Sequence, residues 1–254
     1  MNGITATWLL TVRAFRESLK QPANELPNAF IPLFFYVVTV GAIGSVAQNA
    51  FGVADYKGFQ LPVAVLQGAA GVASGAGLAM TLDIQSGYFE KLALTSTPRL
   101  AIVLGRMLAD AIKAVILAGA IIVLALLYGS EFKTGIPGMA VLMAATFGFA
   151  LAYSGIGVAI ALKTGSPQAA QAGFIVFFPL LFLAPTFAPI EVFAAWLEAV
   201  ARVNPVTYIL LGMRSLVTEG WDAAALAKGG VAVLAIGAVT LTLTLLALRS
   251  RVRQ

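Results

Sequence analysis

Long apolar stretches alternate with short polar ones along the chain, and the apolar stretches have the length of membrane-crossing helices. A helix needs about 20 consecutive apolar residues to cross the roughly 30 Å hydrocarbon core of a bilayer. The pattern predicts an all-α integral membrane protein with six transmembrane helices in a single domain, residues 1–254. The helices are expected from about Ala29 to Ala47, Leu61 to Leu82, just after Pro98 to Tyr128, Ile136 to Leu162, Ala169 to Phe187 and Gly229 to Leu248.

The composition agrees with a membrane protein and excludes several kinds of site. Hydrophobic residues make up 60% of the chain and charged residues 11%, whereas a soluble domain carries about 25% charged residues. Histidine and cysteine are absent, so the chain cannot build a Cys/His zinc site, a disulfide or a His-dependent nucleophilic active site. The net charge of +5 does not indicate nucleic-acid binding, because the basic residues lie at the ends of apolar runs.

The distribution of basic residues sets the predicted orientation. With a cytosolic N-terminus, eleven of the 16 Lys and Arg residues fall on the cytosolic side and five on the opposite side. Cytosolic loops of membrane proteins carry an excess of these residues. Both termini are therefore predicted to be cytosolic, and the N-terminus does not have the order of a cleavable signal peptide.

The first 25 residues predict an amphipathic helix on the cytosolic leaflet. Apolar and charged side chains recur there with helical periodicity, which suits a helix lying in the membrane interface. The helix would be either an elbow that braces a moving bundle or a simple anchor. Its apolar face holds Trp8, Leu9, Val12, Phe15 and Leu19, and its charged face holds Arg13, Arg16, Glu17 and Lys20.

A polar interruption separates the second and third spans, within the cytosolic segment 83–99. Glu90 and Lys91 stand among apolar residues there, a pattern that predicts a short amphipathic helix. Thr97 and Pro98 are expected to be the N-cap and first residue of the next helix. Such a helix would either transmit motion from a cytosolic partner or simply turn the chain. Its apolar residues are Tyr88, Phe89, Leu92 and Leu94.

The third span carries Arg106, Asp110 and Lys113 on one helical face. The charge-free run that follows, Ala114 to Tyr128, is 15 residues long and would cover about 22 Å, less than the hydrocarbon core. The three charges are therefore expected either to extend toward the cytosolic headgroups or to form an inner gate. In the gate, Arg106 and Asp110 would make ion pairs that break during transport.

Helix-breaking and small residues predict local departures from straight spans. Pro179 and Pro185 are expected to kink or break the fifth span, and the chain beyond it is expected to re-enter the outer leaflet over residues 186–220, turning at Asn204 and Pro205. In the second span, the step from Gly71 to Gly75 permits close helix packing or lines a cavity.

The polar interruption resembles the coupling-helix region of ABC type-2 transporter permeases. The residues that carry this resemblance are Gly87, Glu90, Leu92, Leu94, Thr97, Pro98, Gly105 and Arg106. A second match, with Asn204, Pro205 and Arg214, is similar to the external re-entrant region of the same family. The resemblance covers nearly the whole chain and includes drug- and lipid-exporting permeases of the daunorubicin-resistance type.

The resemblance implies two groups of functional residues. The first would dock a soluble P-loop ATPase, and the second would form an external gate. The docking group is Gly87, Tyr88, Phe89, Glu90, Lys91, Leu92, Thr97, Pro98 and Arg99, and the gate is Pro185, Phe187, Trp196, Asn204, Pro205 and Arg214.

The resemblance also implies a function. The chain would be the permease of an ATP-driven exporter in a prokaryotic plasma membrane, moving an amphipathic or lipophilic substrate outward. It would work as a homodimer, or beside a similar permease, with two ATPase copies that bind ATP and Mg²⁺. The chain has no G-x-x-x-x-G-K-[ST] loop, so it would be no enzyme and would hold no cofactor itself. The alternatives are a secondary transporter or channel driven by an ion gradient, and an inert scaffold.

Overall fold

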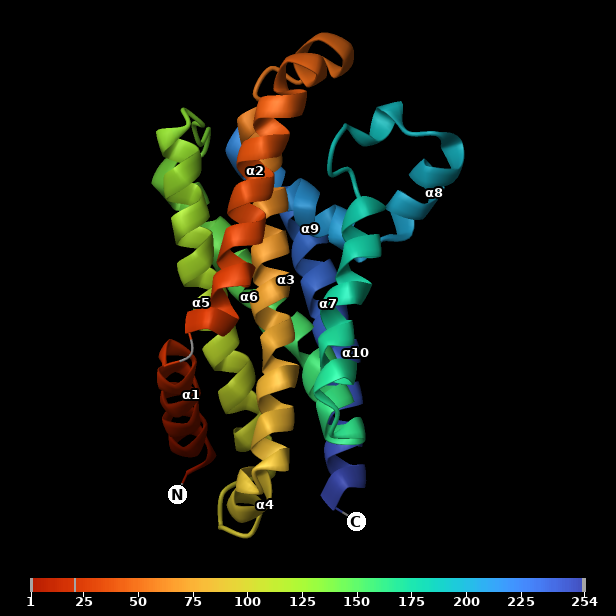
Figure 1. Cartoon of the computed structure of the whole chain (residues 1–254). Coiled ribbons are helices and arrows are strands. Elements are labelled where there is room, and N and C mark those ends of the chain that lie inside the picture. Colours follow the sequence, from red (N-terminus) through yellow and green to blue (C-terminus); the bar gives the residue numbers. More distant parts are fainter. Residues whose placement is uncertain (1, 21, 253–254) are drawn as a thin grey trace.

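The computed structural model describes residues 2–20 and 22–252, and within these ranges the chain is helical without any β-strand. This confirms the all-α prediction (Figure 1). The α-helices are α1 (Gly3–Leu19), α2 (Pro22–Phe51), α3 (Tyr56–Gln85), α4 (Tyr88–Ala93), α5 (Arg99–Leu127), α6 (Gly135–Thr164), α7 (Pro167–Phe182), α8 (Ala195–Val203), α9 (Pro205–Arg214) and α10 (Ala223–Val252). A 3₁₀ turn, η1 (Ile190–Val192), precedes α8, and a π turn, η2 (Ser215–Glu219), follows α9.

Among the described residues, five helices are long and apolar enough to cross a membrane: α2, α3, α5, α6 and α10. The chain is a multi-pass membrane protein. The expected fifth span is shorter than predicted, because α7 has 16 residues and covers about 24 Å. The helix ends at Phe182 instead of Phe187. Pro185 explains the early end, since proline cannot donate a helical hydrogen bond and disfavours helical geometry in the residue before it.

The helices form an elongated bundle with two distinct ends (Figure 1). The short helix α4 and the C-terminal end of α10 lie at one end, toward which α1 also extends, and we call this the α4 end. The opposite end carries α8 and the turns around it, and we call it the α8 end. Each end contains one of the two groups of residues expected to be functional.

Helix α3 is the centre of the bundle and is buried along most of its length against α2, α5, α6 and α7. Its closest approach is to α6, where Gly77 faces Gly157. A Cβ atom added at Gly77 would lie 2.7 Å from the backbone carbonyl carbon of Gly157. The small-residue contact predicted for the second span therefore exists at Gly77, whereas a Cβ added at Gly75 would meet nothing within 4 Å.

Helix α1 packs along the first turns of α5 and lies beside the bundle in Figure 1. Gly105 permits the contact, because an added Cβ there would lie 2.7 Å from Cβ of Leu10. Trp8, Leu9 and Leu19 are exposed and point away from the bundle. This agrees with the expected apolar face. The location of α1 in the membrane interface remains a prediction.

Candidate functional site

At the α4 end, α4 is held to the bundle by one aromatic anchor. Gly87 starts the turn into α4 with a φ of 71°, a conformation that glycine adopts without steric cost. Phe89 is then only 2% exposed and belongs to a buried cluster with Met80, Ile84 and Val103. Burying a phenylalanine side chain contributes about 2 kcal/mol or more. Helix α4 is thus a fixed projection rather than a loose loop.

The outward side of α4 is polar and is connected to two other helices. Glu90 and Lys91 are exposed, and Glu90 Oε1 lies 3.3 Å from a guanidinium nitrogen of Arg251 on α10. The guanidinium of Arg13 on α1 lies 3.6 Å from the centre of the Tyr88 ring. A force on α4 would therefore reach α1 and α10 as well as the neighbouring α3 and α5.

Two details of this region differ from the sequence prediction. Leu94 follows the last residue of α4 and is 89% exposed, so it does not share the buried side with Phe89. Pro98, not Thr97, is the N-cap of α5, and Arg99 is the first helical residue. Pro98 has an extended ψ of 126°, while the Thr97 hydroxyl accepts a hydrogen bond from Thr95 instead of capping α5.

Arg106 lies in a buried ion-pair network where α1, α3 and α5 meet. One terminal guanidinium nitrogen is 3.2 Å from Asp83 Oδ2, and the other is 3.3 Å from Glu17 Oε2. Arg13 adds a contact of 3.3 Å to Asp83 Oδ1. The expected pairing between Arg106 and Asp110 is therefore replaced by pairs that tie α5 to α1 and α3.

Asp110 pairs instead with Lys113, whose Nζ is 2.6 Å from Asp110 Oδ1 and 2.6 Å from Glu25 Oε1 on α2. Asp110 is 2% exposed, and its second oxygen, Oδ2, has no hydrogen-bond partner in the described part of the chain. The charged trio is thus enclosed by neighbouring helices and does not extend along a lipid-facing surface.

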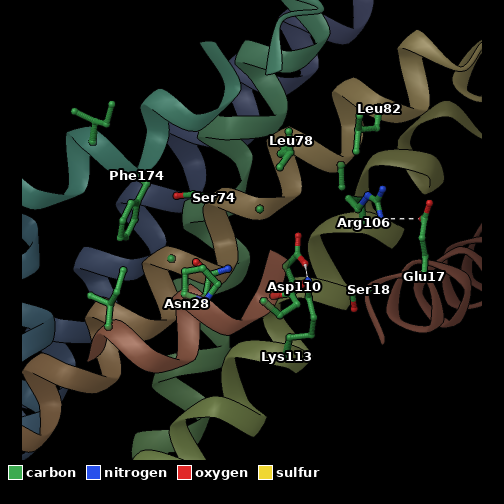
Figure 2. Close-up of a pocket in the computed structure, with 17 residues that line it drawn as sticks. Glu17, Ser18, Asn28, Ser74, Leu78, Leu82, Arg106, Asp110, Lys113 and Phe174 are labelled. Atoms are coloured by element: carbon green, nitrogen blue, oxygen red, sulfur yellow. Dashed lines mark hydrogen bonds and ion pairs between the residues drawn. The ribbon is translucent and has the colours of Figure 1, made fainter. Parts of the chain in front are cut away.

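These charges line a pocket of about 390 Å³ between α1, α2, α3, α5 and α7, which we call the charged pocket (Figure 2). Gly71, Ser74 and Gly75 form its α3 wall, so the glycine step of the second span lines a cavity. Gln67 on the same helix lines neither this pocket nor the cavity at the α8 end. The opposite wall is largely apolar and includes Ile31, Phe174 and Ile175.

At the α8 end, Arg214 is a buried cation held by backbone carbonyls. It is 4% exposed, and it donates to the oxygens of Phe59 at 3.2 Å and Pro185 at 2.8 Å. Its guanidinium carbon lies 3.4 Å from the centre of the Phe59 ring. Within the described ranges, no carboxylate oxygen lies within 4.0 Å of its nitrogens.

Further hydrogen bonds join the end of α7 and the chain after it to α3 and α9. The Gln60 side chain donates to Thr186 O at 2.9 Å, and the Tyr56 hydroxyl donates to Phe187 O at 3.2 Å. Asn204 caps α9 by accepting from the Val206 N–H at 3.0 Å and donates to Leu180 O at 2.6 Å. Irregular backbone at membrane depth needs such partners.

Most of the expected external-gate residues therefore come together. Pro185, Phe187, Asn204 and Arg214 lie in this hydrogen-bonded region, and Pro205 is the first residue of α9. Trp196 is separate from them, on α8, and is 67% exposed. Arg214 also lines a cavity of about 990 Å³ that opens at this end of the bundle.

The exposed side of α8 carries an ion pair of a different kind. Arg202 Nε donates to Glu198 Oε1 at 3.0 Å. That hydrogen bond raises the pKa of Arg202, so its guanidinium stays charged. Because the Arg202 side chain is 67% exposed and that of Glu198 is 35% exposed, solvent screens the pair, and it adds little to stability.

Comparison with known proteins decides the family. Residues 5–218 match the ABC-2 type transporter family. The chain belongs to this family. It is also similar to the daunorubicin resistance ABC transporter permease protein DrrB1 of Streptomyces coeruleorubidus, with 25% identity over 226 residues that cover 87% of this chain and 78% of the relative. The resemblance found in the sequence is confirmed, and this ABC-2 permease is a membrane transport subunit without ATPase activity of its own.

The sequence did not reveal three acidic partners of the charged residues on α5, two of which line the charged pocket and the third of which, Asp83, lies beside it in the ion-pair network. Glu17, Glu25 and Asp83 come from three different helices, and each pairs with a cation far away in the chain. Asp83 carried a usable signal, because an acid in the last turn of an apolar helix needs a basic partner. The sequence did not identify that partner.

Replacing Arg214 by lysine in this ABC-2 permease should lower its stability by about 1 to 3 kcal/mol. Lysine keeps the charge but cannot lie flat over Phe59 while donating to two separate carbonyls. Thermal unfolding of the purified protein in detergent measures the effect. Arg202→Lys is the matched control and should leave the melting temperature nearly unchanged. Equal melting of the two variants would disprove the structural role of Arg214.

Proposed function

We propose that this permease is the transmembrane subunit of an ATP-driven exporter of amphipathic or lipophilic compounds. The observation that carries the proposal is α4, a short helix fixed to the bundle by Phe89 that presents Glu90 and Lys91 outward. This geometry suits an element that receives a push from a soluble ATPase and passes it to α3 and α5. Two ATPase copies would serve a pair of permeases, in our proposal a homodimer.

The α4 end would face the cytosol of a prokaryotic cell. The excess of Lys and Arg predicted for the cytosolic side supports this orientation. Both ends of the chain would then be cytosolic, and α8 and α9 would lie on the extracytoplasmic side. We also assign the docking role to Tyr88 and Leu92 within α4 and to the flanking residues Gly87, Thr97, Pro98 and Arg99.

Two sets of contacts would act as gates in this exporter. At the cytosolic side, Arg106 and Lys113 join α5 to α1, α2 and α3, so rearranged ion pairs would open the charged pocket. At the other side, Arg214 holds Pro185 in the chain after α7, and Asn204 holds Leu180 near the end of α7. Release of these contacts would open the exit.

The substrate class rests on the apolar walls of the charged pocket and on the similarity to a permease whose name refers to daunorubicin resistance. A pocket dominated by aromatic and aliphatic side chains suits an organic molecule with an apolar body. A polyanion would require a dense basic surface, which the pocket does not offer.

Glu90→Lys should uncouple ATP hydrolysis from transport while the protein still inserts into the membrane. In proteoliposomes with the partner ATPase, ATP-driven transport should fall at least about tenfold, since a like-charge contact at an interface costs several kcal/mol. ATP hydrolysis and transport are measured on the same vesicles. Normal transport by this variant would contradict docking through Glu90.

The ion pair with Arg251 provides the control for this experiment. Glu90→Gln removes both a docking charge and the pair to α10, whereas Arg251→Gln removes the pair alone. Docking predicts a clear loss of transport for the first variant and near-normal transport for the second. Equal losses would mean that Glu90 acts only within the permease.

A further inference from the structure

The charges around the charged pocket do not balance. The ion pairs connect four carboxylates, Glu17, Glu25, Asp83 and Asp110, with three cations, Arg13, Arg106 and Lys113. In their ordinary ionised forms these groups leave one negative charge in excess. Glu17 and Glu25 are partly exposed to solvent, whereas Asp83 and Asp110 are buried. A missing positive group is therefore most costly at a buried carboxylate.

One atom identifies where that positive group belongs. Asp110 Oδ1 contacts Lys113, but Oδ2 is buried and has no partner within the described residues. Asp110 lines the charged pocket, and in Figure 2 its carboxylate points toward the space between α3 and α5. A buried carboxylate oxygen without a donor has lost its hydrogen bonds to water and gained none in return, which destabilises the folded protein. A donor carried by a ligand would remove this cost.

Among the described residues, Arg106 Nε is the other buried polar atom of this pocket without a partner. Its guanidinium already contacts two carboxylates, Asp83 and Glu17. The net charge of the network, rather than this single donor, therefore decides which kind of ligand the pocket attracts. That charge is negative, so the ligand should be a cation.

The remaining walls define the rest of the ligand. Leu78 and Gly75 of α3, Ile31 of α2 and Phe174 of α7 line the pocket and give it an apolar part. The volume of about 390 Å³ lies within the range of sites that hold small organic molecules. Phe174 offers a ring face on which an apolar ring can stack.

We propose that the charged pocket binds an amphipathic molecule with one ammonium group, which donates to Asp110 Oδ2 while its apolar body contacts Phe174. The ammonium belongs either to an exported amine or to the headgroup of an aminophospholipid. This proposal rests on the proposed function and adds two things to it: the substrate carries a positive charge, and it binds in the charged pocket. Binding of the ammonium compound requires neither ATP nor the ATPase.

Lys113 can remain in place when the ligand binds. Its Nζ contacts Glu25 as well as Asp110 Oδ1, so the ligand needs only the free oxygen. For the same reason Asp110→Asn should fold, because Lys113 keeps Glu25 as its partner. This variant changes the charge of the site with almost no change in side-chain volume.

Binding is tested with the purified full chain in phosphatidylcholine nanodiscs, whose choline headgroup has no N–H to donate. The probe is dansylcadaverine, a fluorescent primary amine, and the matched neutral probe is its N-acetyl derivative. We expect the amine to bind at least about tenfold more tightly than the acetylated probe. Asp110→Asn should remove this preference and leave binding of the neutral probe unchanged. Equal binding of both probes to the wild-type chain would overturn the proposal.

Gly75 provides a second variant that keeps every charge. A Cβ added there meets no atom within 4 Å, and because Gly75 lines the pocket, a longer side chain would extend into it. Gly75→Leu should therefore weaken binding of both probes at least about tenfold. Gly41→Leu is the control, because Gly41 is exposed on α2, has equal room and lies outside the pocket. Unchanged probe binding by Gly75→Leu would place the binding site elsewhere and overturn the proposal.

The source of the ammonium is tested by adding phosphatidylethanolamine to the nanodiscs. Loss of dansylcadaverine binding identifies the lipid headgroup as the occupant, and unchanged binding identifies a separate amine. In both cases the amine binds at Asp110, so both results agree with the proposed site. Failure of the proposed function is a different result, since ATP-driven transport by Glu90 and Arg251 variants is measured with the ATPase present. Transport without amine preference would reject this site alone.

Discussion

Gly77→Ala should destabilise the permease by about 3 kcal/mol or more, although alanine is the better helix former by about 1 kcal/mol. The new Cβ would lie 2.7 Å from backbone carbon and oxygen atoms of Gly157. Backbone cannot rotate away as a side chain can, so α3 and α6 would have to separate. Their contact lies at the centre of the bundle, and separation would disturb both buried clusters.

Two neighbouring glycines make this expectation specific. Gly75→Ala adds the same methyl group where nothing lies within 4 Å, so it should be neutral or slightly stabilising. Gly157→Ala places its Cβ 3.2 Å from the Gly77 backbone and should have an intermediate effect. Thermal unfolding of the three purified variants measures the order. A Gly77→Ala protein that melts like Gly75→Ala would show that the two helices are not in close contact.

The sequence predicted most helices well because the signal for a membrane helix is local. The third span was expected to start after Pro98 and the fourth to extend from Ile136 to Leu162, and α5 and α6 have nearly these bounds. The fifth span was overestimated because hydropathy continues through Phe187, whereas Pro185 interrupts the backbone hydrogen bonding. Apolar composition and helical geometry are separate properties, and the two disagree in this segment.

The site was predicted less completely because its partners are distant in the chain. Periodicity correctly placed Arg106, Asp110 and Lys113 on one face of α5, all lining the charged pocket. It gave no means of choosing between Asp83 and Asp110 as the partner of Arg106, since that choice depends on how α1 and α3 pack against α5. Likewise, Asn204 was recognised as a turn, but its contact with Leu180 O required the folded chain.

Lys113→Met should be the most damaging change among the charged residues, with an expected loss of about 3 to 5 kcal/mol. Methionine fills a similar volume, so the effect reports mainly the lost charge. Asp110 would be left buried without a cation, while Glu25 is partly exposed and can reach water. Thermal unfolding in detergent measures the loss. Arg202→Met provides the comparison, because it breaks an exposed pair and should change the melting temperature little.

The double variant Lys113→Met with Asp110→Asn tests the reason for that loss. If an unpaired buried carboxylate causes the damage, removing its charge should recover most of the lost stability, because a neutral pair of similar volume carries no desolvation cost for ions. If packing causes it, the second substitution should give no recovery. Recovery of stability without recovery of amine binding would separate the two roles of Asp110. In the resting protein Lys113 neutralises one oxygen of Asp110, and the other oxygen remains for the ligand.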